Sequence, residues 1–283
     1  MKRILAVLWG DDDGEVVLGS AFEIARMFGS RVVGIYVRPP AGEFIPSGDF
    51  GMALSQDYLD RLHRESAAKA ARLRAAFQET AGRLGIKPGD VGGTDGVTAE
   101  WVEAEGSAAM FIGSYGRVFD LIVLRKPDPK ISAETEILLE AALFESGRPI
   151  LVVPKPRPMP QGGTVAIAWN GSTETASVLA LGLPLLTKAG KVIVVSVEGG
   201  MVPGPTGAEV AQYLQCHDIA ASVRHVQLDG QQTGEAFLRE AMKLEADLMF
   251  KGAYTQSRLR QLVFGGATRH ILSHAQIPVL FAR

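Results

Sequence analysis

The sequence has very little cysteine and no strong charge of either sign. Its single cysteine, Cys216, excludes an internal disulfide framework and a cysteine-based metal cluster. The 29 basic and 31 acidic residues give a net charge of −2, which argues against nucleic acid or an anionic membrane as the main partner. No apolar run approaches the roughly 20 residues that span a bilayer. We therefore expect a globular protein in a reduced, cytoplasmic setting, with one large or two small domains.

The N-terminal segment begins with basic residues followed by apolar ones, an order shared with signal peptides. Its apolar run covers only six residues, Ile4–Trp9, and then meets an acidic turn. A signal peptide needs an apolar run of about 7–15 residues, so a buried strand at Arg3–Val7 fits better.

This strand opens a βαβ unit. A second strand is predicted at Arg31–Val37, because the segment is almost continuously apolar. Between the two strands, apolar residues recur at helical spacing over Glu15–Phe28, and Gly29 is the expected helix stop. Apolar strands joined by helices indicate a parallel sheet that is covered on both faces.

The same unit recurs in the second half of the chain. Thr164–Trp169 matches Ile4–Trp9, and Lys191–Val197 matches Arg31–Val37, with the same offset along the chain for both strands. The helix between the two strands is therefore expected to have the same length in both copies. Repeats of this size indicate duplicated domains rather than a solenoid.

The last two strands recur at a smaller offset. Asp120–Leu124 matches Asp247–Lys251, and Pro149–Val153 matches Pro278–Ala282. The smaller offset means that the first copy is longer than the second between its second and fourth strands. Much of the excess is a Pro/Gly-rich stretch at residues 39–48 and a long predicted helix over residues 55–84.

The segment Pro154–Gly163 contains four prolines and ends in paired glycine, as a short and fairly stiff linker would. We predict two α/β domains, residues 1–155 and residues 162–283. Each would be a doubly wound, five-stranded parallel sheet of order 3-2-1-4-5 with helices on both faces. The strands expected in the second half are Thr164–Trp169, Lys191–Val197, Ser222–Leu228, Asp247–Lys251 and Pro278–Ala282.

A sheet of this order binds ligands at its switch point, outside the carboxyl ends of strands 1 and 4. In the second half, the loops at this point are residues 169–172 and the long segment Lys251–Thr268. Glycines at both ends of that segment, followed by a helix that ends near His274, suit a phosphate. In the first half, the corresponding loops carry three aspartates and the prolines of residues 125–130, so we expect no nucleotide there.

At these residues the chain resembles the universal stress protein family in its tandem form, over essentially its whole length. ATP-binding members carry Gly-x2-Gly-x9-Gly and then Ser or Thr after strand 4. Gly252 and Gly265 match the first and third glycines. Thr255 replaces the second glycine and Gly266 replaces the hydroxyl residue, while Thr268 could supply that hydroxyl.

The resemblance also implies an adenine pocket. The family's aspartate at the end of strand 1 corresponds to Asn170, whose amide can both donate and accept hydrogen bonds. The backbone of Val197 would contact adenine, and the flanking residues that would line the pocket are Ala168, Trp169, Lys251 and Ala267. The cofactor implied is ATP or another adenine nucleotide, with or without Mg²⁺.

The family further implies that the two domains pair through their last strands, Pro149–Val153 and Pro278–Ala282, around a pseudo-twofold axis. Both segments are apolar and would otherwise be exposed edges that promote aggregation. A tandem chain thereby mimics a dimer of single domains. Two such chains could associate further into a homodimer.

Other polar groups have a structural and a functional interpretation. Asn170-Gly171 suits a tight turn, and Ser172 suits a helix N-cap. Arg258 and Arg260 could reach phosphates or be solvated. His270 and His274 could bind a metal, but they fit the surface of a helix better. Asp11, Asp12 and Asp13 could bind a cation, but they fit a solvated acidic turn at a helix N-terminus better. Cys216 is expected to be buried.

The leading hypothesis is regulatory binding of ATP by the C-terminal domain, in a protein of the stress response. Any hydrolysis would be slow, because the sequence has no nucleophile elbow, no Gly-Lys-Ser/Thr loop and no assigned catalytic or metal residue. The alternative is a nucleotide-independent interaction scaffold that engages a partner through residues 39–57. An adenylyl-transferring enzyme is a third, weaker option, because no catalytic base is evident.

Overall fold

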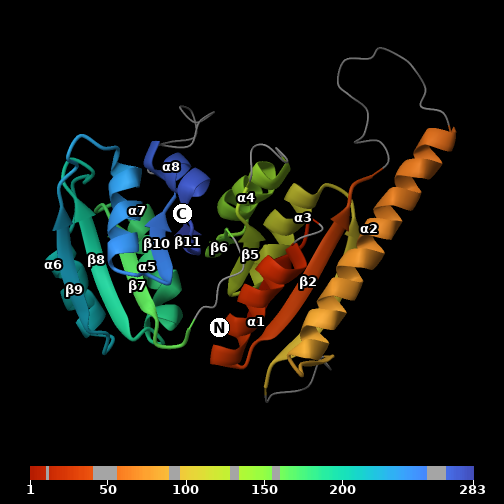
Figure 1. Cartoon of the computed structure of the whole chain (residues 1–283), viewed down its shortest axis with the longest axis horizontal. Coiled ribbons are helices and arrows are strands. Elements are labelled where there is room, and N and C mark those ends of the chain that lie inside the picture. Colours follow the sequence, from red (N-terminus) through yellow and green to blue (C-terminus); the bar gives the residue numbers. More distant parts are fainter. Residues whose placement is uncertain (11–12, 41–55, 89–95, 128–133, 155–159, 254–265) are drawn as a thin grey trace, which may run out of the picture.

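The computed structural model describes residues 1–10, 13–40, 56–88, 96–127, 134–154, 160–253 and 266–283. Within these residues the strands form one 11-stranded sheet, in the order β3-β4-β2-β1-β5-β6-β11-β10-β7-β8-β9 (Figure 1). The strands are β1 Arg3–Val7, β2 Arg31–Arg38, β3 Lys87–Pro88, β4 Thr98–Glu105, β5 Leu121–Arg125, β6 Ile150–Val153, β7 Thr164–Trp169, β8 Lys191–Val197, β9 Ala221–Val226, β10 Leu248–Gly252 and β11 Val279–Ala282.

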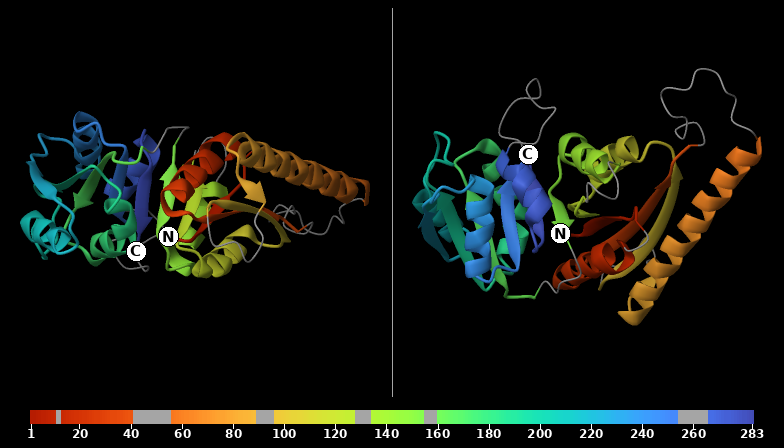
Figure 2. Two further views of the ribbon diagram at one scale, coloured as in Figure 1. Left: turned by 90° about the horizontal axis from the view of Figure 1, so that it is seen from below. Right: turned by 45° about the horizontal axis from the view of Figure 1, so that its top comes forward.

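Helices cover both faces of this sheet (Figure 2). They are the π-helical turn η1 Gly14–Leu18, α1 Gly19–Phe28, α2 Gln56–Arg83, α3 Ala108–Tyr115, the 3₁₀ turn η3 Gly116–Val118, α4 Glu134–Glu145, α5 Thr173–Leu186, α6 Gly207–Gln215, α7 Thr233–Lys243 and α8 Gly266–His274. Among the described residues, no helix combines the length and the apolar character that a membrane span requires.

The strand order confirms the predicted doubly wound topology. In the second half, β9-β8-β7-β10-β11 is the order 3-2-1-4-5, and β4-β2-β1-β5-β6 repeats it in the first half. The first half differs from the prediction of five strands, because the two-residue strand β3 pairs with the outer side of β4. Neighbouring strands within each half are parallel, as a doubly wound sheet requires.

The two halves meet where β6 pairs with β11, and this pair is antiparallel. Leu151 lies opposite Leu280, Ile150 opposite Phe281, and Val152 opposite Val279. Exchanging the two halves leaves this register unchanged, so a pseudo-twofold axis passes between the two leucines. The predicted pairing of the last strands is confirmed, and the pair converts two apolar edges into the interior of one sheet.

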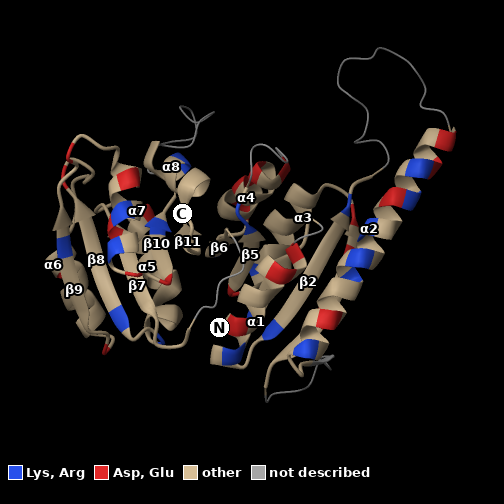
Figure 3. Cartoon of the chain, in the orientation of Figure 1, with Lys and Arg blue, Asp and Glu red and all other residues tan. Residues whose placement is uncertain are grey.

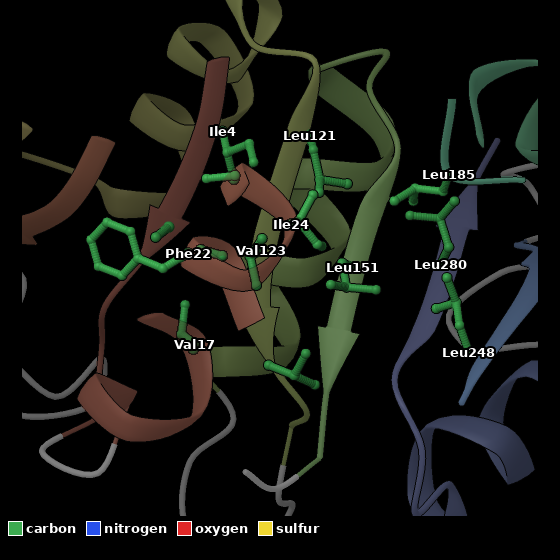
Figure 4. Packing of buried hydrophobic residues seen from close by; sticks show 14 of the residues in the cluster. Ile4, Val17, Phe22, Ile24, Leu121, Val123, Leu151, Leu185, Leu248 and Leu280 are labelled. Carbon is green, nitrogen blue, oxygen red and sulfur yellow. The ribbon is translucent and has the colours of Figure 1, made fainter. Parts of the chain in front are cut away.

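The apolar core forms two layers, one on each face of the sheet, and both layers cross the junction. One layer contains residues of α1, α2, α5 and α6, and the other contains residues of α3, α4, α7 and α8. Figure 4 shows the first layer, where Leu151 and Leu280 lie on either side of the junction. Both leucines are fully buried.

Side chains beside the strands add contacts between the halves. Nζ of Lys126, just after β5, donates to the carbonyl of Ser273 at 2.9 Å and reaches that of Ala275 at 3.4 Å. These carbonyls lie at the C-terminus of α8, where a cation also interacts favourably with the helix dipole. The guanidinium of Arg283 lies 4.5 Å from the centre of the Phe144 ring.

The equal offset predicted for the first two strands of the repeat is wrong by one residue. In the parallel pairing of strands 1 and 2, Arg3 lies opposite Arg31, and Thr164 lies opposite Lys191. With Lys191 as the counterpart of Arg31, Thr164 therefore corresponds to Arg3 and not to Ile4. The first half has one extra residue between the two strands. It also has the π-helical turn η1, whose wider i→i+5 hydrogen bonding takes up an extra residue.

Most of the remaining difference between the halves is the helix after strand 2. In the first half this helix is α2, with 28 residues, whereas its counterpart α6 has nine. α2 runs along the outer side of the first half and carries charges of both signs (Figure 3). It packs closely on the sheet at Gly34, where an added Cβ would lie 2.5 Å from the ring of Phe77.

Cys216 is exposed, so the prediction that it is buried is wrong. It follows the last turn of α6, whose buried residues are Gly207, Val210 and Leu214. That spacing marks one face of a helix, and Cys216 falls outside it.

We predict that Gly182→Ala destabilises the protein. The new Cβ would lie 2.2 Å from Cε2 of Phe250 and 2.9 Å from Cδ2 of Leu280, both in the core. Overpacking of this kind costs about 1–3 kcal/mol. Urea unfolding measures the loss. The control is Gly82→Ala in α2, where an added Cβ meets nothing within 4 Å and the variant should be as stable as the native protein or more so. Equal stability of Gly182→Ala and the native protein would contradict this packing.

Candidate functional site

The candidate site lies at the carboxyl ends of β7, β8 and β10. Lys251 on β10 pairs with Ala168 on β7, and Trp169 pairs with Ser196 on β8. These three strands are neighbours in the sheet, so the structure brings the predicted residues of strands 1, 2 and 4 to one edge.

Asn170 is buried and organises the turn after β7. Its Oδ1 accepts hydrogen bonds from the Ser172 amide, at 3.3 Å, and from the Thr175 hydroxyl. Ser172 is the N-cap of α5, because its hydroxyl accepts from the Thr175 amide at 3.3 Å. The turn and cap interpretations are confirmed. The Nδ2 group of Asn170 has no hydrogen-bond partner in the described part of the chain, so a donor remains at the edge of the sheet.

A loop that sequence reasoning missed covers this turn. The Val202 amide donates to the Asn170 carbonyl at 2.8 Å. Gly204 lies so close to Gly171 that an added Cβ would be 2.3 Å from the Gly171 carbonyl oxygen. Gly171 has φ +84°, which explains its glycine. In the sequence, only the two glycines themselves, Gly171 and Gly204, hinted at this close contact.

Lys251 is the most unusual side chain at this edge. It is 3% exposed, and its Nζ donates to the Gly252 carbonyl at 2.8 Å. Burial lowers the pKa of Lys251 to about 8, and the nearby carboxylate of Glu174 partly offsets this effect. Oε2 of Glu174 is itself buried without a hydrogen-bond partner among the described residues.

Gly252 contacts the start of α5 directly. An added Cβ would lie 2.5 Å from the Thr175 amide nitrogen and 2.6 Å from the Glu174 carbonyl carbon. The glycine is therefore required for strand–helix packing, whatever else it does. A bulky residue such as valine would disturb the fold, so Lys251 offers a cleaner position for testing binding.

The other predicted residues occupy different positions. Val197 is buried in the layer that contains α7 and α8. The Trp169 side chain lies in the opposite layer, where its Nε1 donates to the Pro205 carbonyl at 2.8 Å. Gly266, Ala267 and Thr268 form the first turn of α8, and Thr268 is buried. The predicted positions that lie outside the described residues are Thr255, Gly265, Arg258 and Arg260.

In the first half, the corresponding loops are bound to each other. The carboxylate of Asp13 accepts from the amides of Trp9 and Gly10, and it forms an ion pair with Arg125 at 3.5 Å. Asp13 is 2% exposed, so the expectation of a solvated acidic turn is wrong for this residue. Burial raises its pKa, and the two amides and Arg125 oppose that rise. Asp11 and Asp12 lie outside the described residues.

On α8, the imidazole rings of His270 and His274 stack on each other, with ring centres 4.3 Å apart. Nδ1 of His274 lies 3.0 Å from the His270 carbonyl. No cluster of three or more His, Cys, Asp or Glu with metal-binding geometry occurs in the described ranges.

Comparisons with known proteins agree with this architecture. Residues 164–283 match the model of the Universal stress protein family. A universal stress protein from Archaeoglobus fulgidus DSM 4304 has a similar structure, with a TM-score of 0.68 at 15% identity over 99% of this chain and 98% of that one. A proposed universal stress protein from Pseudomonas aeruginosa UCBPP-PA14 gives 0.58 at 15% identity over 100% and 93%. The sequence has no match among curated proteins.

The sequence likeness to the universal stress protein family is thus limited to residues 164–283. The two solved structures cover both halves and share the fold with this chain.

We predict a pH-dependent contribution of Lys251 to stability. The folded state loses its proton near pH 8 and the unfolded state near 10.5, so the unfolded state binds more protons between these values and the native fold gains stability as pH rises. At about 1.4 kcal/mol per pH unit, the full change is roughly 3 kcal/mol.

Urea unfolding of the native protein and Lys251→Met between pH 7 and 10 measures this effect. The advantage of the variant should shrink with rising pH. Lys191→Met, which removes an exposed lysine at the start of β8, should show no such trend. Parallel profiles for native protein and Lys251→Met would contradict the burial of a charged amine.

Proposed function

We propose that residues 162–283 form a domain that binds ATP or another adenine nucleotide, with or without Mg²⁺, and that this binding is regulatory. The observation that carries the proposal is the buried ammonium of Lys251 at the carboxyl end of β10, the strand that the chain leaves before it reaches α8. A helix N-terminus and a desolvated cation both favour an anion. The family match of residues 164–283 supports a nucleotide as that anion.

Different residues at the carboxyl ends of these strands would contact the phosphates and the adenine ring. The phosphates would lie near Lys251 and the backbone of Gly266, Ala267 and Thr268. Among the described residues, an added Cβ at Gly266 would meet nothing within 4 Å, which leaves room beside this backbone. The free donor of Asn170 would contact a ring nitrogen of adenine, and the backbone of Val197 would lie beside the ring. Thr255 and Gly265, which lie outside the described residues, would complete the phosphate loop.

We propose one nucleotide per chain. Residues 1–155 would form a second domain of the same fold whose switch point is closed, because Asp13 binds the loop amides that a phosphate would need and pairs with Arg125. The tandem chain would act in the cytoplasm during the stress response, alone or as a homodimer. Hydrolysis, if present, would be slow.

One observation favours the alternative, an interaction scaffold without nucleotide. Oδ1 of Asn170 already accepts two hydrogen bonds within the chain, which leaves this amide only its donor for adenine. The segment suggested as the partner contact, residues 39–57, lies mostly outside the described residues.

Calorimetric titration with ATP tests the proposal. We expect saturable binding of one ATP per chain. Lys251→Met should weaken binding at least about tenfold, because a charge-assisted hydrogen bond in a desolvated site is lost. Lys191→Met should bind as the native protein does. No saturable binding at millimolar ATP would rule out the nucleotide function and leave the scaffold.

A further inference from the structure

The first half contains a cleft of about 440 Å³ that the proposed nucleotide site does not use. It lies between α2 and the carboxyl ends of β1 and β2, and its volume falls within the roughly 300–1,000 Å³ of small-molecule sites. The residues that line it and carry its chemistry are Trp9, Tyr36, Glu65, Ser66, Lys69, Arg72 and Glu134.

Two aromatic rings form one wall of this cleft. The rings of Trp9 and Tyr36 lie with their centres 6.1 Å apart and their planes inclined by 49°. Nε1 of Trp9 donates to the Glu134 carboxylate at 3.0 Å, which fixes the indole in place. A rigid aromatic wall of this kind suits a flat ring, because offset or tilted ring pairs attract one another.

A cation lies over the aromatic wall. Nζ of Lys69 on α2 is 5.3 Å from the centre of the Trp9 ring and 5.8 Å from that of Tyr36. Within the described residues, this ammonium forms no ion pair and no hydrogen bond. The carboxylate of Glu65, one turn away, pairs instead with Arg61 at 3.4 Å. Lys69 is therefore a cation at the cleft whose three donors are available to an acceptor.

A second polar group in the cleft also lacks a partner. Oγ of Ser66, on the same helix as Lys69, is buried and has no hydrogen-bond partner among the described residues. Buried hydroxyls are nearly always bonded, so an unbonded one at a cleft indicates a place for an external acceptor. Ser66 and Lys69 are three residues apart and share one face of α2.

This chemistry is specific to the first half. Continuing the register of β1 and β7, Trp9 takes the place that Asn170 occupies in the second half, and Tyr36 takes the place of Ser196. An indole and a phenol thus replace an amide and a hydroxyl. The long helix α2, which supplies Lys69 and Ser66, has only the short α6 as its counterpart.

We propose that this cleft binds a small aromatic monoanion, such as an aromatic carboxylate. Its ring would pack on Trp9 and Tyr36, and its carboxylate would accept from Lys69 and Ser66. The site is separate from the proposed nucleotide site, which lies in the other half of the chain.

Calorimetry with three probes tests the ring and the charge separately. We expect 2-naphthoate to bind once per chain, and to bind equally well with saturating ATP present. The uncharged isostere 2-naphthamide and the non-aromatic cyclohexanecarboxylate should each bind at least about tenfold more weakly, because each lacks one of the two contacts. Equal binding of 2-naphthoate and 2-naphthamide would overturn the proposal.

Variants of the cleft give the second part of the test. Lys69→Met should remove the preference for 2-naphthoate over 2-naphthamide, whereas Lys69→Arg should keep it. Ser66→Ala should weaken 2-naphthoate several-fold, and Lys191→Met should change nothing. If circular dichroism shows that Lys69→Met folds poorly, the affinities of Lys69→Arg and Ser66→Ala for 2-naphthoate still test the proposal. Lys69→Arg should keep the affinity and Ser66→Ala should lower it. An unchanged 2-naphthoate affinity in Lys69→Met or Ser66→Ala would contradict the assignment.

Discussion

The antiparallel pairing of β6 with β11 is the contact on which the rest of the structure depends. Each half on its own would expose a fully apolar edge strand, and pairing buries both edges in one sheet. It also places β6 and β11 in the interior of the sheet, so that the last strand beside each fourth strand, β5 or β10, is itself paired on both sides. Lys126 at the end of α8 strengthens this junction from the side.

Small changes in a common fold have given the two halves different chemistry. One extra residue after β1 accompanies a π-helical turn, a buried Asp13 and an ion pair with Arg125. A helix of 28 residues in place of nine creates an aromatic and cationic cleft. The second half has an Asn170 amide donor without a partner among the described residues, and a buried cation at Lys251. The sequence suggested that the two halves differ in ligand binding. In the structure, they differ in which polar and charged side chains lie at the carboxyl ends of the strands.

Much of the fold was predictable from the sequence. The apolar strands and the helix stop at Gly29, which has φ +60°, follow from local patterns. The one-residue error in aligning β1 with β7 has a physical cause: a strand that is apolar on both faces does not reveal which residue points to which face. The exposure of Cys216 depends on which face α6 buries, and so short a helix does not show that clearly.

The candidate site was predictable only in part. Its location follows from the topology, but the contact of Gly252 with α5 and the cover over Gly171 involve segments that are distant in sequence. The ion pair of Asp13 with Arg125 also joins distant residues, so the acidic turn was misjudged.

Hydrogen exchange measured by mass spectrometry, with and without ATP, tests the central claim most directly. ATP should protect peptides at the carboxyl ends of β7 and β10 and the start of α8, and leave those after β1 and β5 unchanged. Protection in the first half, or none anywhere, would contradict a single nucleotide site in the second half.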